Sequence, residues 1–195
     1  MIDKAFIDSH IEELIDCVNK ASKEIINVYE GDDFGHIEKS DGSPLTIADK
    51  NANQVILDEL KSISLDISII SEETFENNQL KNLDKTYWLV DPLDGTKEFI
   101  NKTDEFTVNI ALIDNKQAIF GIVAAPVTGK VWYGSVFDKN ITEEESVDKI
   151  RIVMSKSHKS ENDKAFLEFI DSKNINYEII EKGSSLKLCS LADNE

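Results

Sequence analysis

The sequence predicts an α/β fold in which layers of helices alternate with mixed sheets. Two helix patterns come first, a run of strand patterns follows, and helix and strand patterns then alternate. Of the 195 residues, 41% are hydrophobic, which is enough for a buried core. Because each helix and each sheet has an apolar surface to bury, this order of elements is typical of stacked α/β layers.

The first part of the chain contains two predicted helices. In residues 4–29 aliphatic side chains recur at helical spacing, and acids and lysines fill the other face. Residues 30–44 interrupt this pattern with three glycines and a proline, so we expect a loop or an irregular hairpin there. Residues 45–63 form the second predicted helix, which Thr46 and Asp49 begin with a Ser/Thr-x-x-acid capping pattern.

The middle of the chain has the composition of strands. Short apolar strands are predicted at residues 67–71 and 87–90. Three longer segments rich in β-branched and aromatic residues follow at 106–113, 117–126 and 130–137. Turn residues separate these segments, so each is expected to form one strand of a sheet.

The last part of the sequence alternates between strands and helices. The predicted elements are, in order, a strand, a helix, a strand and a helix at residues 151–155, 161–173, 176–180 and 184–192. In the first of these helices Phe166, Leu167 and Ile170 are expected to face inward.

The formal net charge of −17 restricts the partners of the chain. Such an acidic surface repels nucleic acid and anionic membranes, and a polyanionic substrate would need cations or backbone N–H groups beside it. No apolar run approaches the roughly 18 residues that span a bilayer, and the N-terminus has no signal-peptide pattern. Cys17 and Cys189 have no disulfide or metal-binding spacing, so we expect reduced, buried thiols in a cytoplasmic setting.

The stretch YWLVDPLDGTKEFI, residues 87–100, places two carboxylates after an apolar strand. Asp91 is expected to close that strand and Asp94 to lie in the turn that follows, while Glu72 closes the preceding strand. If the two strands run parallel, the three acids meet at one edge of the sheet, where α/β proteins bind ligands. Clustered carboxylates repel one another, so a cation is the natural partner, and oxygen ligands favour Mg²⁺ or Mn²⁺ over Zn²⁺.

The turn after these carboxylates has its own signals. Gly95 permits a positive φ or a close ligand, and residues 95–97 can open a short helix whose N–H groups face a phosphate. An ordinary turn with capping carboxylates is an alternative, as is a plain capping role for Asp49. Leu93 excludes an EF-hand loop starting at Asp91, and it also excludes the DxD motif of aspartyl-phosphate hydrolases.

Taken together, these segments resemble the inositol monophosphatase superfamily of magnesium-dependent, lithium-sensitive phosphomonoesterases. WLVDPLDGTKEFI resembles the family signature, SEET its upstream metal motif and SDGSPLTIAD its Lys-to-Asp segment. Lys97-Glu98 after DGT, SKSH at 155–158 and GSSLKLC at 183–189 are similar to the bacterial 3'(2'),5'-bisphosphate nucleotidase branch. The resemblance covers nearly the whole chain and implies a layered α/β/α/β/α sandwich of the inositol monophosphatase and fructose-1,6-bisphosphatase type.

The resemblance also implies a metal site. Glu72, Asp91 and the Leu93 carbonyl would hold a first Mg²⁺, and Asp91 and Asp94 a second. Glu72 would also touch a third, weaker ion, Mn²⁺ could replace Mg²⁺, and Li⁺ would inhibit. Asp49 would pair with the Thr96 hydroxyl to orient the attacking water, so Asp49, Thr96 and Glu72 are the expected catalytic residues.

The expected substrate contacts extend beyond this turn. The residues implied are Leu93, Asp94, Gly95, Thr96, Lys39, Ser157, His158, Gly183 and Ser184. The implied division is an N-terminal α+β domain that binds metal and phosphate, residues 1–148, and an incomplete C-terminal α/β domain, residues 149–195.

The implied reaction is hydrolysis of a small phosphate ester by metal-activated water, without a covalent intermediate. The expected substrate is adenosine 3',5'-bisphosphate, cleaved to AMP and phosphate. An inositol- or sugar-phosphate phosphatase of the same superfamily and an inactive metal- or phosphate-binding remnant are the alternatives. The expected location is the cytoplasm, including the periphery of the inner membrane.

The family pattern has a further Asp in a WDxAAG-like stretch after the GSSLKLC segment, whereas this sequence ends at LADNE. From the sequence we therefore expect a fold truncated in its C-terminal half, slow turnover, and association of copies into a homo-oligomer through uncovered apolar surface.

Overall fold

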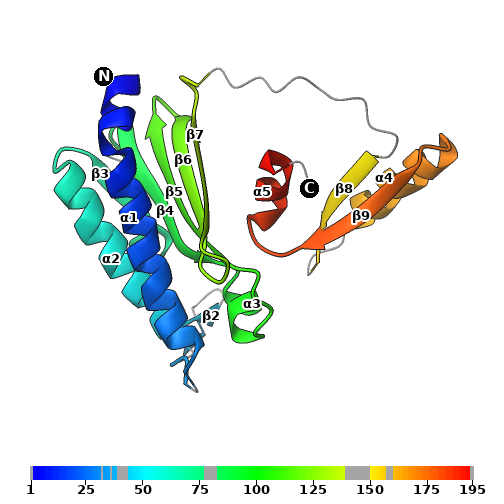
Figure 1. Ribbon diagram of the computed structural model, residues 1–195, viewed down its shortest axis with the longest axis horizontal. Coiled ribbons are helices and arrows are strands. Elements are labelled where there is room, and N and C mark those ends of the chain that lie inside the picture. Colours follow the sequence, from blue (N-terminus) through cyan, green and yellow to red (C-terminus); the bar gives the residue numbers. More distant parts are fainter. Residues whose placement is uncertain are drawn as a thin grey trace. The chain divides into compact units, whose positions relative to one another are not determined.

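The computed structural model describes residues 2–31, 33–35, 37–38, 44–76, 83–138, 150–156 and 160–193. It divides the chain into two compact units, Met1–Lys139 and Asn140–Glu195 (Figure 1). The residues around this division lie outside those described, so the domain boundary expected after residue 148 stays a prediction.

Two helices of the first unit match the sequence patterns. The first, α1, spans Lys4–Tyr29, and the second, α2, spans Ile47–Ile63. Between them, β1 (Ile37–Glu38) pairs antiparallel with β2 (Pro44–Leu45), which confirms the irregular hairpin.

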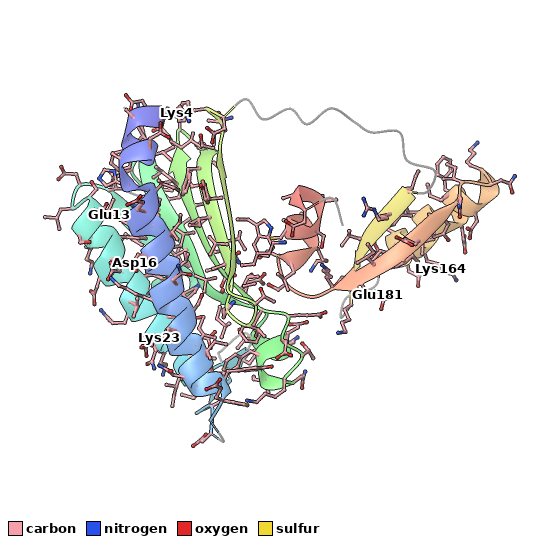
Figure 2. All side chains as sticks on the ribbon, in the orientation of Figure 1. Lys4, Glu13, Asp16, Lys23, Lys164 and Glu181 are labelled. Carbon is pink, nitrogen blue, oxygen red and sulfur yellow. The ribbon has the colours of Figure 1, made fainter. Side chains whose placement is uncertain are left out.

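The outer face of α1 is charged. Glu13, Asp16 and Lys23 are exposed along it (Figure 2). The opposite stripe, which includes Leu14 and Ile25, is buried. This amphipathic pattern explains why a helix of this length is stable against a sheet.

A mixed five-stranded sheet lies in the first unit with these helices. Its strands, in spatial order, are β3 (Ser68–Ser71), β4 (Thr86–Asp94), β5 (Thr107–Asp114), β6 (Gln117–Ala125) and β7 (Lys130–Ser135). The pair β3–β4 is parallel and the other three neighbouring pairs are antiparallel. The expected parallel pairing of the first two strands is therefore confirmed.

The core lies between one face of this sheet and the two helices. Side chains alternate along β4, so Trp88 and Val90 are buried while Leu89, between them, is 44% exposed. The buried strand residues form one cluster with apolar side chains of α1 and α2, among them Leu14 and Ile56. Full burial of an aliphatic side chain contributes about 1.5–3 kcal/mol, so this cluster fixes α2 against the sheet.

The second unit is smaller. Parallel strands β8 (Ile150–Ser155) and β9 (Tyr177–Lys182) are joined through α4 (Glu161–Ser172), and α5 (Leu186–Ala192) follows. In α4, Ile170 is buried as expected, but the prediction that Phe166 faces inward is wrong because its exposed fraction is 49%. A two-stranded sheet is too narrow to cover the whole apolar stripe of a helix.

Both cysteines are free and buried, as expected: Cys17 lies in α1 and Cys189 in α5. Burial raises the pKa of the Cys17 thiol to about 12. None of the helices in the described residues is long and apolar enough to cross a membrane.

Candidate metal- and phosphate-binding site

Strand β4 does not end at Asp91, as the sequence suggested, but continues to Asp94. Asp91 pairs with Asn109 of β5, and Asp94 pairs with Thr107, with a register shift between them. Pro92 has no N–H to donate to a regular ladder, which accounts for the irregularity. Such irregularities turn neighbouring side chains in new directions, and here an acid lies on each side of one.

The residue after β4 allows a sharp change of direction. Gly95 has φ 90° and ψ 39°, in the left-handed region, and it caps α3 (Thr96–Ile100). A residue with a Cβ is strained there. The expected short helix and the positive φ are confirmed, whereas its contact with a phosphate stays a prediction.

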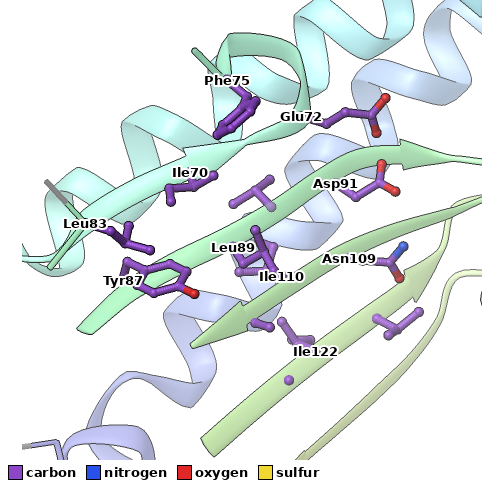
Figure 3. Close-up of a pocket in the computed structure, with 14 residues that line it drawn as sticks. Ile70, Glu72, Phe75, Leu83, Tyr87, Leu89, Asp91, Asn109, Ile110 and Ile122 are labelled. Atoms are coloured by element: carbon purple, nitrogen blue, oxygen red, sulfur yellow. The ribbon is translucent and has the colours of Figure 1, made fainter. Parts of the chain in front are cut away.

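The parallel register brings a third acid to the same edge. Ser71, the last residue of β3, pairs with Val90, so Glu72 follows β3 at the level where Asp91 follows Val90. Figure 3 shows Glu72, Asp91 and Asn109 in a row across neighbouring segments.

The Asp91 carboxylate is unfavourable as an anion. Burial first, and then the negative charges of Glu72, Asp94 and Asp49, together raise its pKa to about 7, while the Leu93 N–H opposes the shift. That N–H donates to Oδ1 of Asp91 at 3.2 Å. Because a nearby cation would reverse the repulsion, this electrostatic environment is suited to one.

Asp49 connects α2 to this turn. Its Oδ2 accepts hydrogen bonds from the Thr46 N–H at 2.7 Å and the Thr46 hydroxyl at 2.5 Å. Its Oδ1 lies 3.2 Å from the Thr96 hydroxyl, which also lies 3.2 Å from the Leu93 carbonyl oxygen. The two interpretations of Asp49 are therefore compatible, since one oxygen belongs to the helix cap and the other faces α3.

Burial raises the pKa of Asp49, and the hydrogen bonds from Thr46 and Thr96 oppose this shift. The side chain is only 1% exposed. A buried carboxylate of this kind is a stronger base than an exposed one, which suits it to handling a proton.

The available donors fit a hard cation. Within the described ranges, no three His, Cys, Asp or Glu side chains are already gathered into a metal cage. Mg²⁺ does not need one, because it keeps several waters and binds through one or two carboxylates. Glu72, Asp91, Asp94 and the Leu93 carbonyl supply oxygen only, and Asp91 has the raised pKa expected of a carboxylate that lacks a positive neighbour.

Not every expected site residue can be assigned to this edge. Lys39, Ser157 and His158 lie outside the described residues. Gly183 and Ser184 belong to the second unit, in the turn between β9 and α5, where Ser184 has φ 52°. The expected role of these five residues in substrate binding stays a prediction.

Asn109 is a site residue that sequence reasoning missed. Together with Glu72 and Asp91 it forms the polar end of a pocket of about 630 Å³ (Figure 3). The remaining lining is mostly aliphatic and includes Ile70 and Leu89. An amide in the middle of the apolar segment 106–113 was the signal that could have indicated it.

The sequence also matches a known protein family. The sequence profile of the Inositol monophosphatase family matches residues 8–195. The chain belongs to the inositol monophosphatase family. This membership confirms the resemblance seen in the sequence motifs.

Within the family, curated relatives include the 3'(2'),5'-bisphosphate nucleotidases CysQ of Shigella flexneri and Escherichia coli K12. Each is 37% identical, and the match covers 95% of this chain and 77% of the relative. The crystal structure of CysQ from Bacteroides thetaiotaomicron matches with a TM-score of 0.78 and 31% identity, over 95% of this chain and 77% of that one.

The fold is shared more widely. The suhB protein of Bartonella henselae has a TM-score of 0.76 at 19% identity, over 94% of this chain and 74% of its own. At this identity the match shows the fold alone. It confirms the α/β class and the mixed sheet flanked by helices.

Proposed function

We propose that this protein is a Mg²⁺-dependent phosphomonoesterase that converts adenosine 3',5'-bisphosphate to AMP and phosphate. The observation that carries the proposal is the position of Glu72, Asp91 and Asp94 at one sheet edge, near enough for the charges of the other two to raise the pKa of Asp91, with the Asp49–Thr96 pair beside them. The names of the CysQ relatives support the choice of a bisphosphate nucleotide over other phosphate esters.

The metal ligands proposed are Glu72, Asp91 and the Leu93 carbonyl for a first Mg²⁺, and Asp91 and Asp94 for a second. Mn²⁺ has similar preferences for oxygen and can substitute. When bound, such cations neutralise the substrate phosphate, activate water as a nucleophile and stabilise the leaving oxygen. They would also remove the mutual repulsion that raises the pKa of Asp91.

The chain's own residues orient the attacking water. When the Thr96 hydroxyl donates its hydrogen bond to Oδ1 of Asp49, the lone pairs of the Thr96 oxygen are free to accept a hydrogen bond from water. Asp49 cannot rotate away, because its other oxygen is held by two bonds from Thr46. We therefore assign Asp49 and Thr96 the role of holding the water in line with phosphorus, a geometric effect that lowers the barrier.

The substrate phosphate would lie against the backbone from Leu93 to Thr96. Gly95 has no Cβ and a left-handed φ of 90°, so the chain can turn there and present its N–H groups at close range. We further propose that Lys39, Ser157, His158, Gly183 and Ser184 complete the contacts to the nucleotide.

A phosphate-release assay tests the proposal. We expect Mg²⁺-dependent release from adenosine 3',5'-bisphosphate, inhibited by Li⁺, with kcat/KM at least about tenfold above inositol 1-phosphate and fructose 1,6-bisphosphate, equivalent to about 1.4 kcal/mol. A preference for the inositol ester would identify a different phosphatase of the family. No release from any of the three would contradict the proposed activity.

A further inference from the structure

We infer that Asn53 and Ser71 form a positioning pair that holds the metal ligand Glu72 in register with Asp49; the inference rests on the proposed function. The Ser71 hydroxyl donates to Oδ1 of Asn53 at 2.6 Å. Ser71 is 1% exposed and Asn53 6% exposed. Neither residue is among the ligands or the catalytic residues proposed above.

The position of Asn53 on α2 connects this hydrogen bond to Asp49. Asn53 follows Asp49 by four residues, and side chains at this spacing lie on the same helix face, about 5–6 Å apart at Cβ. One helix face therefore directs one polar side chain to Thr96 of α3 and the next to Ser71 of β3. The same rigid helix contacts both sides of the site.

The position of Ser71 connects the bond to the carboxylates. Ser71 is the last residue of β3, Glu72 follows it directly, and its strand partner Val90 directly precedes Asp91. A shift of Ser71 along α2 would move Glu72 relative to both Asp91 and Asp49. The hydrogen bond thus fixes the position of Glu72 at the end of β3.

Packing alone does not explain a polar pair at this place. A buried hydrogen bond contributes only about 0.5–1.5 kcal/mol net, and two apolar side chains of similar shape can be equally stable. Apolar contacts, however, tolerate small sliding movements, whereas a hydrogen bond requires a particular distance and angle. The directional bond is therefore of use where the exact level of a neighbouring residue matters.

The test is Mg²⁺ affinity measured by titration calorimetry on the whole chain. Ser71→Ala and Asn53→Leu should each weaken Mg²⁺ binding by about tenfold, the lower end of the range for residues that orient metal ligands. The double variant should bind Mg²⁺ no more weakly than either single variant, because both changes remove the same bond. Ser71→Thr, which keeps the hydroxyl, should restore the affinity to within about threefold of the parent.

Thr86→Val is the matched control. Its hydroxyl donates to Oδ1 of Asp114, also at 2.6 Å, but at the opposite end of β4 from Asp91. This variant also loses one hydrogen bond and should lower the melting temperature, while Mg²⁺ affinity remains that of the parent.

If Ser71→Ala lowers the melting temperature like the control and leaves Mg²⁺ affinity unchanged, the pair is only structural and the inference is overturned. A parent chain that binds no Mg²⁺ would also overturn it, because Glu72 would then be no ligand. If the parent binds Mg²⁺ without releasing phosphate, the proposed nucleotidase activity fails, and the affinities of the variants still decide the role of the pair.

Discussion

The Thr96 hydroxyl lies 3.2 Å from Oδ1 of Asp49, although 47 positions separate the two residues in the sequence. This contact joins the start of α2 to the start of α3, the two elements between which the proposed nucleophilic water would be held.

Thr96→Ala should therefore impair chemistry more than substrate binding. We expect kcat to fall by about 100-fold, the loss that a misplaced reactant can cause, with a much smaller change in KM. Steady-state kinetics with adenosine 3',5'-bisphosphate measures both. Thr96→Ser keeps the hydroxyl and should retain most of kcat. A normal kcat in Thr96→Ala would mean that Asp49 serves only as a helix cap.

Asp91→Asn should abolish tight Mg²⁺ binding while the protein remains folded. Asp91 is the residue proposed as a ligand of both ions. Even the loss of a residue that only orients a ligand weakens metal binding by about 10–100-fold. Calorimetric titration measures the affinity, and circular dichroism verifies the fold. Asp66→Asn, in an exposed turn before β3, removes the same charge away from the site and should leave affinity unchanged. Equal affinities in the two variants would exclude Asp91 as a ligand.

The raised pKa of Asp91 also predicts how stability depends on pH without metal. Its pKa is about 7 in the folded protein, against an ordinary value of about 3.9. Folding thus favours the protonated form of Asp91. The contribution of this residue to the free energy of unfolding is therefore complete below about pH 4 and is lost as the pH rises through 7. Asp91→Asn cannot ionise and escapes this loss.

In EDTA, we therefore compare the melting temperature of Asp91→Asn with that of the parent at each pH. The variant-minus-parent difference should be larger at pH 8 than at pH 5. A difference of 1 kcal/mol corresponds to about 2–4 °C in a protein of this size. Differential scanning calorimetry at the two pH values measures it. A difference between variant and parent that is the same at both values would show that Asp91 ionises normally.

Gly95→Ala should damage both stability and the site. At φ 90° a Cβ is strained, which costs about 1–2 kcal/mol. Gly129 provides the control, because it has φ 69° in the turn after β6, and a Cβ there would meet no atom within 4 Å. The melting temperature should fall by a similar amount in both alanine variants, but only Gly95→Ala should lose phosphate release. Equal activity in the two would mean that the backbone at Gly95 does not approach the substrate.

Local patterns predicted the helices well and the strand end poorly. The helix at Lys4–Tyr29 has the bounds expected from its apolar spacing, and Thr46 caps α2 as its capping pattern indicated. The end of β4 was placed too early, because Asp91 interrupts the apolar run. Pairing between Asp94 and Thr107, a tertiary effect that no local pattern contains, carries the strand further.

The site was predictable where a residue type has few uses and not where its role depends on a distant partner. Clustered acids in a Pro- and Gly-containing turn indicate a cation, so Asp91 and Asp94 could be proposed as ligands from the residues themselves. Asn53 and Ser71 are polar residues in otherwise ordinary segments, and only the packing of α2 on β3 makes them partners. The same is true of Asn109, whose position opposite Asp91 follows from the register of β4 and β5.

The parallel pair β3–β4 has a consequence for the order of folding. Strands β5 and β6 are joined by Asn115-Lys116 and can pair by a local turn, whereas parallel strands cannot form a tight hairpin and must meet through a longer connection. Contacts of this non-local kind form slowly. Glu72 and Asp91 come together only through that pair, so an added cation would find its ligands assembled only late. Mg²⁺ should then slow unfolding without accelerating refolding, and stopped-flow rates with and without the ion would reveal any earlier assembly.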